Sequence, residues 1–301
     1  MNILLIGSRG FIGSHLLKYF RKMNHVVWHA DVVVDYNADQ SYLLIDPSNA
    51  NFKPLFEKQK YDICINCSGA ASVPDSIKNP LRDFQLNIVN VFAMLDAIRT
   101  YQPKCKFINF SSAAVYGNPK SLPIKEESDL LPLSPYGKHK FISEQICREF
   151  YDNFGISTCS LRVFSAYGEG LFKQLFWDVF KKSQSENIIE LYGTGNETRD
   201  FIYINDLVSV VDLVCHNGLF VGDSINVACG IGSKINDVIS IFLGNFNREI
   251  HVSYAGKNRE GDPLYWQANI DIIESMGFRA KYTLEEGLKN YFLWASSQSV
   301  N

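Results

Sequence analysis

The chain has 301 residues, of which 46% are hydrophobic and 20% charged, a composition ordinary for a globular protein. Its formal net charge of −3 gives no support to a nucleic-acid or membrane-surface partner. The sequence contains no run of about 18 apolar residues, so no membrane span is expected. The short apolar start before Gly7 lacks the charged flank of a signal peptide, and we expect a cytoplasmic protein.

The seven cysteines are scattered along the chain, as buried and reduced thiols would be. Cys64 and Cys67 form a CxxC pair, but the pair stands in a strand-like run. No second Cys or His pair follows at metal-ligand spacing, so the sequence predicts no metal site.

The first half of the chain alternates short β-rich runs with longer amphipathic segments. Strands are expected at residues 3–6, 26–30, 42–45, 62–67 and 106–111. Helices are expected at residues 11–22, 81–101 and 136–154, the last ending at Gly155. This alternation predicts an α/β fold, with a doubly wound parallel sheet of the Rossmann type over residues 1–160.

From residue 161 the alternation is less regular. Strand-like runs occur at residues 157–164, 188–193, 201–204, 225–228 and 250–254. Helical runs occur at residues 172–183, 206–216, 234–244 and 284–296. We predict that residues 161–301 form a smaller mixed α/β lobe, partly interleaved with the first domain, that holds the substrate.

The stretch GSRGFIG, residues 7–13, lies directly between the first expected strand and the first expected helix. Glycines there permit a tight turn and close approach to a pyrophosphate, which the helix N-terminus also attracts. Asp31, at the end of the next strand, can accept hydrogen bonds from the two ribose hydroxyls of an adenosine. The predicted cofactor site therefore includes Gly7, Arg9, Gly10, Phe11, Ile12, Gly13 and Asp31.

Two residues of this site favour different dinucleotides. Arg9 could reach the 2′-phosphate of NADP, whereas Asp31 would repel that phosphate. We expect NAD as the cofactor, with NADP as the alternative.

The stretch SPYGKHK, residues 134–140, reads as the start of a helix. Ser134 suits the N-cap and Pro135 the first helical position, so Tyr136 and Lys140 share one face. The tyrosine pKa is normally about 10, but a nearby ammonium, the helix N-terminus and an oxidised nicotinamide would each favour the phenolate. With a serine from the pair at residues 111–112, this set can act as an acid–base site.

Together these stretches resemble the extended short-chain dehydrogenase/reductase family, in its branch of NAD-dependent nucleotide-sugar epimerases and dehydratases such as UDP-glucose 4-epimerase. The resemblance runs through nearly the whole chain. Its further matching stretches are IDPSN (45–49), CINCSGAAS (64–72), NPLRDFQLNIVN (79–90), FSSAAVYG (110–117), LRVFSAYG (161–168), ELYGTGNETRDFIYINDL (190–207) and REGDP (259–263).

The resemblance implies roles for individual residues. Tyr136 would be the catalytic acid and base, Lys140 its partner on the nicotinamide ribose, and Ser112 the ligand of the sugar hydroxyl. Further cofactor contacts would come from Asp46, Cys67, Ser68, Gly69 and Asn87. The substrate would meet Ser112, Ser165, Gln174, Tyr192, Arg199 and Arg259, with the tyrosine stacking on the base and the arginines binding the diphosphate and ribose.

The resemblance also limits which reactions we expect the protein to catalyse. Sugar dehydratases of this branch carry Asp-Glu after the catalytic serine or threonine, where this chain has Ala113 and Ala114, so dehydration is not expected. A nucleotide-sugar 4-epimerase is the first reading, and an NAD(P)H-dependent 4-keto reductase of a deoxysugar nucleotide is the alternative. A non-catalytic NAD(P)-binding regulator is a third, although such members usually lose the tyrosine or the lysine.

Other departures leave the substrate open. Ser165 stands where UDP-galactose epimerases have asparagine, and Ala71 stands where some have lysine. The nucleotide and the sugar are therefore not predicted. The helices expected at 81–101 and 136–154 are apolar over more than one face, and in this family the matching helices form a four-helix dimer interface. We expect a homodimer.

Overall fold

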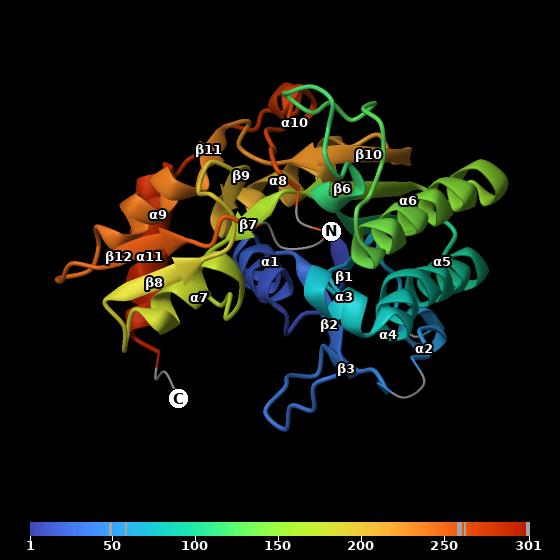
Figure 1. Cartoon of the computed structure of the whole chain (residues 1–301). Helices are drawn as coiled ribbons and strands as arrows, with labels where there is room; N and C mark the ends of the chain where they lie inside the picture. Colours follow the sequence, from blue (N-terminus) through green and yellow to red (C-terminus); the bar gives the residue numbers. More distant parts are fainter. Residues whose placement is uncertain (48–49, 58, 258–260, 262, 299–301) are drawn as a thin grey trace.

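Alternate side chains of the first strand pack into different cores. Leu5 of β1 (Asn2–Ile6) lies in one hydrophobic cluster, whereas its neighbours Leu4 and Ile6 lie in another. Because successive strand residues point to opposite faces, helices must cover both sides of the sheet. The computed structural model, which describes all residues except 48–49, 58, 258–260, 262 and 299–301, has this layered arrangement (Figure 1).

The central sheet has seven parallel strands in the order β10-β6-β5-β4-β1-β2-β3. The other strands are β2 (Val26–Asp31), β3 (Tyr42–Leu44), β4 (Ile63–Asn66), β5 (Lys106–Ser112), β6 (Thr158–Val163) and β10 (Val221–Val227). The predicted doubly wound parallel sheet is therefore confirmed. The carboxyl ends of its strands meet at one edge, where ligands bind in such folds.

Each face of the sheet has its own helices. On one face, α1 (Phe11–Lys22) and α8 (Ile204–Asn217) pack together in the cluster that contains Leu5. On the other face, α2 (Lys53–Glu57), α5 (Asn90–Tyr101) and α6 (Pro135–Phe154) share the cluster that contains Leu4.

Helix α6 begins and ends as its sequence predicts. The Ser134 hydroxyl accepts a hydrogen bond from the Gly137 amide at 3.2 Å, and Pro135 occupies the first turn. Gly155 ends the helix in the left-handed conformation, with φ of 67°. The cap therefore fixes where the helix that carries Tyr136 and Lys140 starts.

The segment expected as one helix over 81–101 is more finely divided. After α3 (Val73–Lys78), α4 (Pro80–Phe84) runs into a π-helical turn over Gln85–Val89, which continues as α5. The amide of Asn90 donates to the carbonyl of Gln85, five residues earlier. Such wider turns are common at functional sites, and this one contains the buried Asn87.

The C-terminal part forms the smaller mixed lobe. Its two sheets pair β7 (Ser165–Tyr167), β9 (Thr198–Tyr203) and β11 (Gly232–Lys234), and separately β8 (Ile188–Leu191) and β12 (His251–Tyr254). Its helices, besides α8, are α7 (Gln174–Lys182), α9 (Ile235–Leu243), α10 (Asp271–Ser275) and α11 (Leu284–Ser296). Since β6 crosses residue 160 and β10 joins the central sheet, the two parts interleave, and a boundary at residue 160 stays a prediction. Within the described part of the chain, no helix is both long and apolar enough to span a membrane.

Candidate active site

The glycine turn after β1 lies against the loop after β4. Gly7 has φ of 83°, and a Cβ atom there would lie 2.6 Å from the amide nitrogen of Ser68. A Cβ atom at Gly13 would lie 2.1 Å from the Gly7 carbonyl oxygen. Only glycine permits both approaches, which bring the start of α1 onto the sheet edge. Gly10, the N-cap, has no side chain, so the amide groups of the first turn remain accessible to an anion. Phe11 and Ile12 follow as the first residues of α1.

Asp31 and Arg9 lie together at the end of β2. The Asp31 carboxylate accepts hydrogen bonds from the amides of Arg9 (2.8 Å) and Val32 (2.7 Å). The Arg9 guanidinium pairs with Asp35 and lies over the Tyr42 ring, 5.1 Å from its centroid. The Asp35 carboxylate thus partly neutralises the positive charge of Arg9. Asp46 follows β3 at an exposed position.

The loop after β4 meets the π-helical turn and α6. A Cβ atom on Gly69, whose φ is 120°, would lie 2.6 Å from Asn87 Oδ1 and 3.6 Å from Lys140 Nζ. Asn87 Nδ2 donates to Asp83 Oδ1 at 3.1 Å. The structure therefore brings together Gly69, Asn87 and Lys140, three predicted cofactor contacts from different elements.

The CxxC pair does not form a joint thiol site. Cys64 is buried in the core beneath α5 and α6, whereas Cys67 packs against the core on the other face. Burial raises the pKa of both thiols. Cys67 and Ser68 instead form the backbone wall against which the Gly7 turn rests.

Ser112, at the carboxyl end of β5, lies close enough to the Tyr136 phenol to affect its pKa. Tyr136 is half-buried, and its amide donates to the Ser76 hydroxyl at 3.1 Å. Burial raises the pKa of the Tyr136 phenol to about 12, against the effect of Ser112, which lowers it. Desolvation is therefore the larger effect on the Tyr136 pKa in this structure.

Lys140 lies one turn further along α6 and is 5% exposed. Its Nζ donates to the Phe110 carbonyl oxygen at 2.7 Å. Burial lowers the pKa of the Lys140 ammonium to about 8, although the nearby Asp83 acts in the opposite direction. The lysine can therefore change its charge near neutral pH.

Two polar contacts beside this set were not predicted from the sequence. His139 Nδ1 lies 2.6 Å from Asp83 Oδ1, and Asp83 is almost completely buried. Arg162 donates to both carboxylate oxygens of Glu144, at 3.0 and 2.8 Å. His139 and Glu144 lie three and eight residues after Tyr136. Their helical spacing from Tyr136 was the only sign in the sequence that they lie near the site. A solvent-exposed helix face has the same spacing, and the sequence does not show that these two side chains are shielded from solvent.

A lysine from the smaller lobe also reaches this region. Lys173 Nζ donates to the Ala71 carbonyl oxygen at 3.4 Å, which joins the loop before α7 to the loop after β4. Gln174, the next residue, has φ of 68°, a strained conformation for a residue other than glycine. Strain of this kind gathers at ligand sites, which fits the predicted role of Gln174.

The remaining predicted substrate residues lie in the smaller lobe. Ser165 in β7 and Arg199 in β9 belong to the same three-stranded sheet. Arg199 donates to the Thr198 and Leu264 carbonyls and lies over the Trp266 ring, 5.5 Å from its centroid. Tyr192 follows β8 and is 64% exposed, as a stacking ring would need to be. Arg259 lies outside the described residues.

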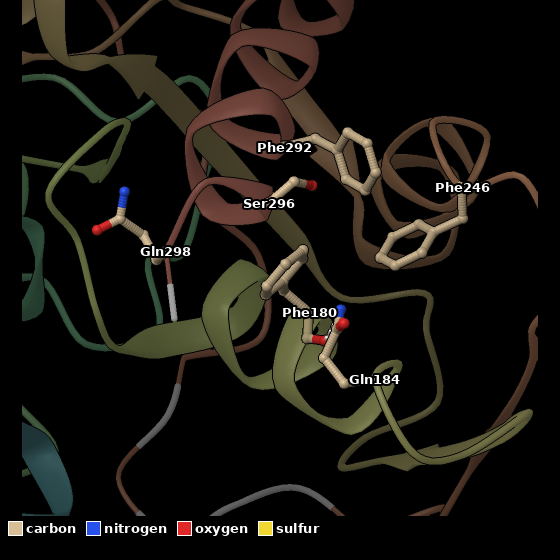
Figure 2. Close-up of a pocket in the computed structure, with 6 residues that line it drawn as sticks. All are labelled: Phe180, Gln184, Phe246, Phe292, Ser296 and Gln298. Carbon is tan, nitrogen blue, oxygen red and sulfur yellow. Dashed lines mark hydrogen bonds between the residues drawn. The ribbon is translucent and has the colours of Figure 1, made fainter. Parts of the chain in front are cut away.

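A separate hollow lies between α7, α11 and the segment after α9 (Figure 2). It is lined by Phe180, Gln184, Phe246, Phe292, Ser296 and Gln298. None of these residues is a predicted site residue, so this hollow is distinct from the candidate active site.

Similarity to known proteins agrees with this arrangement. UDP-glucose 4-epimerase of Pisum sativum is 27% identical over 98% of this chain and 95% of its own. The structure of UDP-N-acetylglucosamine 4-epimerase from Methanobrevibacter ruminantium M1, in complex with UDP-N-acetylmuramic acid, superposes with a TM-score of 0.88 at 26% identity, covering 99% of both chains. UDP-glucuronic acid 4-epimerase from Bacillus cereus, in complex with UDP-glucuronic acid and NAD, gives 0.89 at 26% identity, covering 98% of this chain and 99% of its own. The family resemblance predicted from the sequence is confirmed. A model of the NAD dependent epimerase/dehydratase family matches residues 3–228, three quarters of the chain, and this chain belongs to that family.

Proposed function

We propose that this protein interconverts the C4 epimers of a nucleotide-diphosphate sugar with NAD that remains bound throughout. The observation that carries the proposal is the Ser112–Tyr136–Lys140 set at the carboxyl end of the parallel sheet, beside the glycine turn. The similar 4-epimerases support it, since the enzyme from Bacillus cereus binds both a UDP-sugar and NAD.

The residues around the turn fit NAD. Gly7 and Gly13 let the turn and the start of α1 pack closely against the sheet edge, and the first turn of α1 supplies amide donors for a pyrophosphate. Asp31 would accept hydrogen bonds from the adenosine ribose hydroxyls. Because Arg9 is already paired with Asp35, a 2′-phosphate would meet two carboxylates and one shared cation, which favours NAD over NADP.

Tyr136 would take the proton from the C4 hydroxyl and later return it. When bound, NAD would accept the hydride from C4 and give it back to the opposite face of the 4-keto sugar. The Tyr136 pKa of about 12 is too high for a base at neutral pH. A hydrogen bond from Ser112, the positive nicotinamide and a charged Lys140 would each favour the phenolate. The base would therefore form in the complex with NAD and the sugar, in which C4 is oxidised.

Ala113 and Ala114 argue against dehydration. They follow Ser112 in a short 3-10 turn, and a methyl group there cannot protonate a leaving hydroxyl. A 4-keto reductase would use the same three residues, so cofactor exchange separates it from the epimerase. The contacts at Ser165, Gln174, Tyr192, Arg199 and Arg259 remain predictions, as do the nucleotide and the sugar.

We also propose that the protein is a homodimer. Large apolar side chains are exposed along α4, the π-helical turn, α5 and α6, which lie side by side in Figure 1. They are Leu81, Phe84, Val89, Phe92, Ile142 and Phe154. A second copy would cover this apolar surface.

The nucleotide released on denaturing the purified protein tests the proposed reaction. Mass spectrometry should identify NAD in near-stoichiometric amount, because a cofactor regenerated in each turnover need not leave. An empty site, or one holding NADP or NADPH, would favour the reductase and overturn the epimerase proposal.

A further inference from the structure

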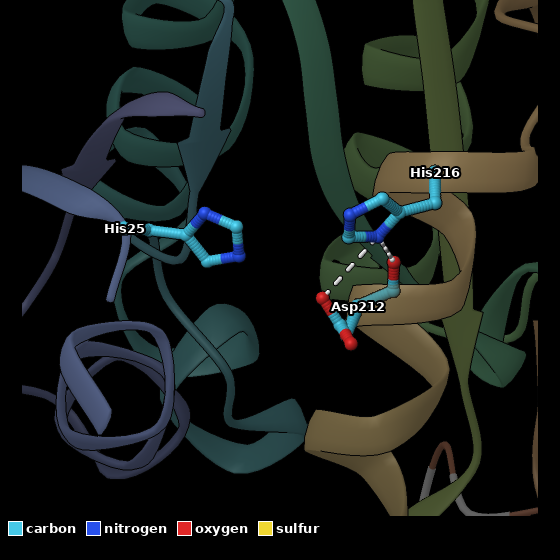
Figure 3. A group of neighbouring side chains, drawn as sticks. All are labelled: His25, Asp212 and His216. Atoms are coloured by element: carbon cyan, nitrogen blue, oxygen red, sulfur yellow. Dashed lines mark hydrogen bonds and ion pairs between the residues drawn. The ribbon is translucent and has the colours of Figure 1, made fainter. Parts of the chain in front are cut away.

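Three metal-ligating side chains meet on the face of the molecule where α1 and α8 pack together (Figure 3). His25 lies in the turn between α1 and β2, and Asp212 and His216 lie in α8. The possible ligand atoms of the three residues lie within 4.8 Å of one another. None of the three belongs to the candidate active site or to the stretches that carry the family resemblance.

The two α8 residues lie next to each other. They are four residues apart and therefore lie one helical turn from each other on the same face. His216 Nδ1 lies 2.8 Å from the Asp212 carbonyl oxygen, to which it can donate its proton. This bond would leave the lone pair of His216 Nε2 available, as in histidine ligands whose other ring nitrogen is hydrogen bonded to the protein.

The Asp212 carboxylate is held from the other side. The Tyr19 hydroxyl donates to Asp212 Oδ2 at 2.9 Å. Asp212 Oδ1 is shielded from solvent and accepts no hydrogen bond within the described part of the chain, although His216 Nδ1 lies 3.4 Å away. A shielded carboxylate oxygen without a donor is costly unless a cation or a proton meets it.

His25 faces this pair from a different element. Its ring centroid lies 6.1 Å from that of His216, with Asp212 beside both rings. The nitrogen of the amino terminus lies 3.1 Å from His25 Nδ1.

We propose that His25, Asp212 and His216 bind one Zn²⁺ ion, which joins the α1–β2 turn to α8. Two histidines and a carboxylate are a common zinc set, with water completing the tetrahedron. Ligand atoms of a tetrahedral zinc site are about 3.3 Å apart, so atoms that lie up to 4.8 Å apart must close by up to about 1.5 Å through rotation about the χ angles. The ion has no part in the sugar chemistry, and the inference stands whether or not the proposed function is correct.

The test uses the untagged full chain, treated with a chelator and desalted, because a polyhistidine tag would bind zinc and an amino-terminal extension would disturb His25. Titration with ZnCl₂, followed by calorimetry and native mass spectrometry, should give one ion per chain. His216→Ala, at a half-exposed position where folding is not at risk, should weaken binding at least about tenfold, as should His25→Ala. The matched control is His251→Ala, an exposed histidine beside Glu249 outside the cluster, which should bind zinc as the parent does.

A second readout excludes binding by the cysteines. Zinc should raise the thermal midpoint of the parent and of His251→Ala, but much less that of His216→Ala. Co²⁺ should give visible d–d absorption bands without the thiolate charge-transfer bands of a cysteine site. No stoichiometric binding, or equal affinity in the parent and both cluster variants, would overturn the proposal.

Discussion

Lys140 donates a 2.7 Å hydrogen bond from Nζ to the Phe110 carbonyl oxygen, two residues before Ser112 in β5. One side chain of α6 therefore anchors the helix to the strand that carries the serine of the proposed site. The same contact keeps the ammonium away from water. The ammonium that anchors α6 to β5 is therefore the same group whose pKa is lowered by burial.

Replacing Tyr136 by phenylalanine should remove turnover and leave cofactor binding intact. The phenylalanine ring fills the same space, but the variant has no group to take the C4 proton, so kcat should fall by about 10²–10⁴-fold. Steady-state rates and the amount of NAD retained after purification are the measurements. Tyr36→Phe, at a tyrosine 96% exposed, serves as the control and should keep full activity. Substantial turnover by Tyr136→Phe would remove Tyr136 from its proposed role.

The buried ammonium of Lys140 should make stability depend on alkaline pH. Its pKa in the folded state is about 8, below the reference value of 10.5. Between these values the unfolded chain holds a proton that the folded chain lacks, so the free energy of unfolding should rise as pH increases from 8 to 10.5. The full effect is about 3 kcal/mol, and the whole penalty is present below pH 8.

Denaturant unfolding of the parent and of Lys140→Met over this pH range checks that expectation. The stability difference between them should change in favour of the parent as pH rises, since methionine has no proton to lose. Lys138→Met, at an exposed lysine of the same helix, should track the parent at every pH. A difference between parent and Lys140→Met that stays constant from pH 7 to 10.5 would show that Lys140 is not perturbed.

Asp31→Asn should weaken NAD binding and reduce discrimination against NADP. The carboxylate would make charge-assisted hydrogen bonds to the ribose hydroxyls and repel a 2′-phosphate, and the amide would do neither well. We expect about a tenfold loss of NAD affinity, corresponding to about 1.4 kcal/mol. Calorimetric titration with both dinucleotides measures it. Asp39→Asn, which alters a half-exposed carboxylate paired with Arg21, is the matched control. An unchanged NAD to NADP affinity ratio would contradict the assignment of Asp31.

The proposed dimer should dissociate when charge is placed on its apolar face. Val89→Asp and Leu81→Asp together would bury two carboxylates against a second copy, a cost of several kcal/mol. Light scattering at micromolar concentration should then give about half the mass of the parent. Leu219→Asp, at a side chain 76% exposed in the loop before β10, should leave the mass unchanged. A monomeric parent, or a dimer that survives both charges, would place the interface elsewhere or remove it.

Local chemistry explains which parts of this site were predictable from the sequence. The turn at Gly7 and Gly13, the cap at Ser134 and the spacing of Tyr136 and Lys140 are each set within a few residues. The parallel sheet then brings Asp31 and Ser112 to the same edge, because strand alternation fixes where the carboxyl ends lie.

The features that could not be predicted from the sequence depend on contacts between distant segments. The π-helical turn that holds Asn87 interrupts a stretch whose apolar spacing is that of a continuous helix. The approach of Lys173 to Ala71 joins loops 102 residues apart. The cluster of His25 with Asp212 joins the turn after α1 to α8, which are even further apart in the sequence. Desolvation, which raises the Tyr136 pKa and lowers that of Lys140, is likewise a property of the packed molecule and not of residue order.

The most direct test of the account is a proton NMR spectrum of the purified protein incubated in D₂O with UDP-glucose, UDP-glucuronic acid or UDP-N-acetylglucosamine, and no added cofactor. The account predicts that at least one of these sugars, or another nucleotide sugar tested in the same way, converts to its C4 epimer with hydrogen retained at C4. Retention follows because the hydride leaves and returns without exchange with solvent. Absence of epimer from every nucleotide sugar, combined with NADPH consumption on a 4-keto sugar nucleotide, would contradict it.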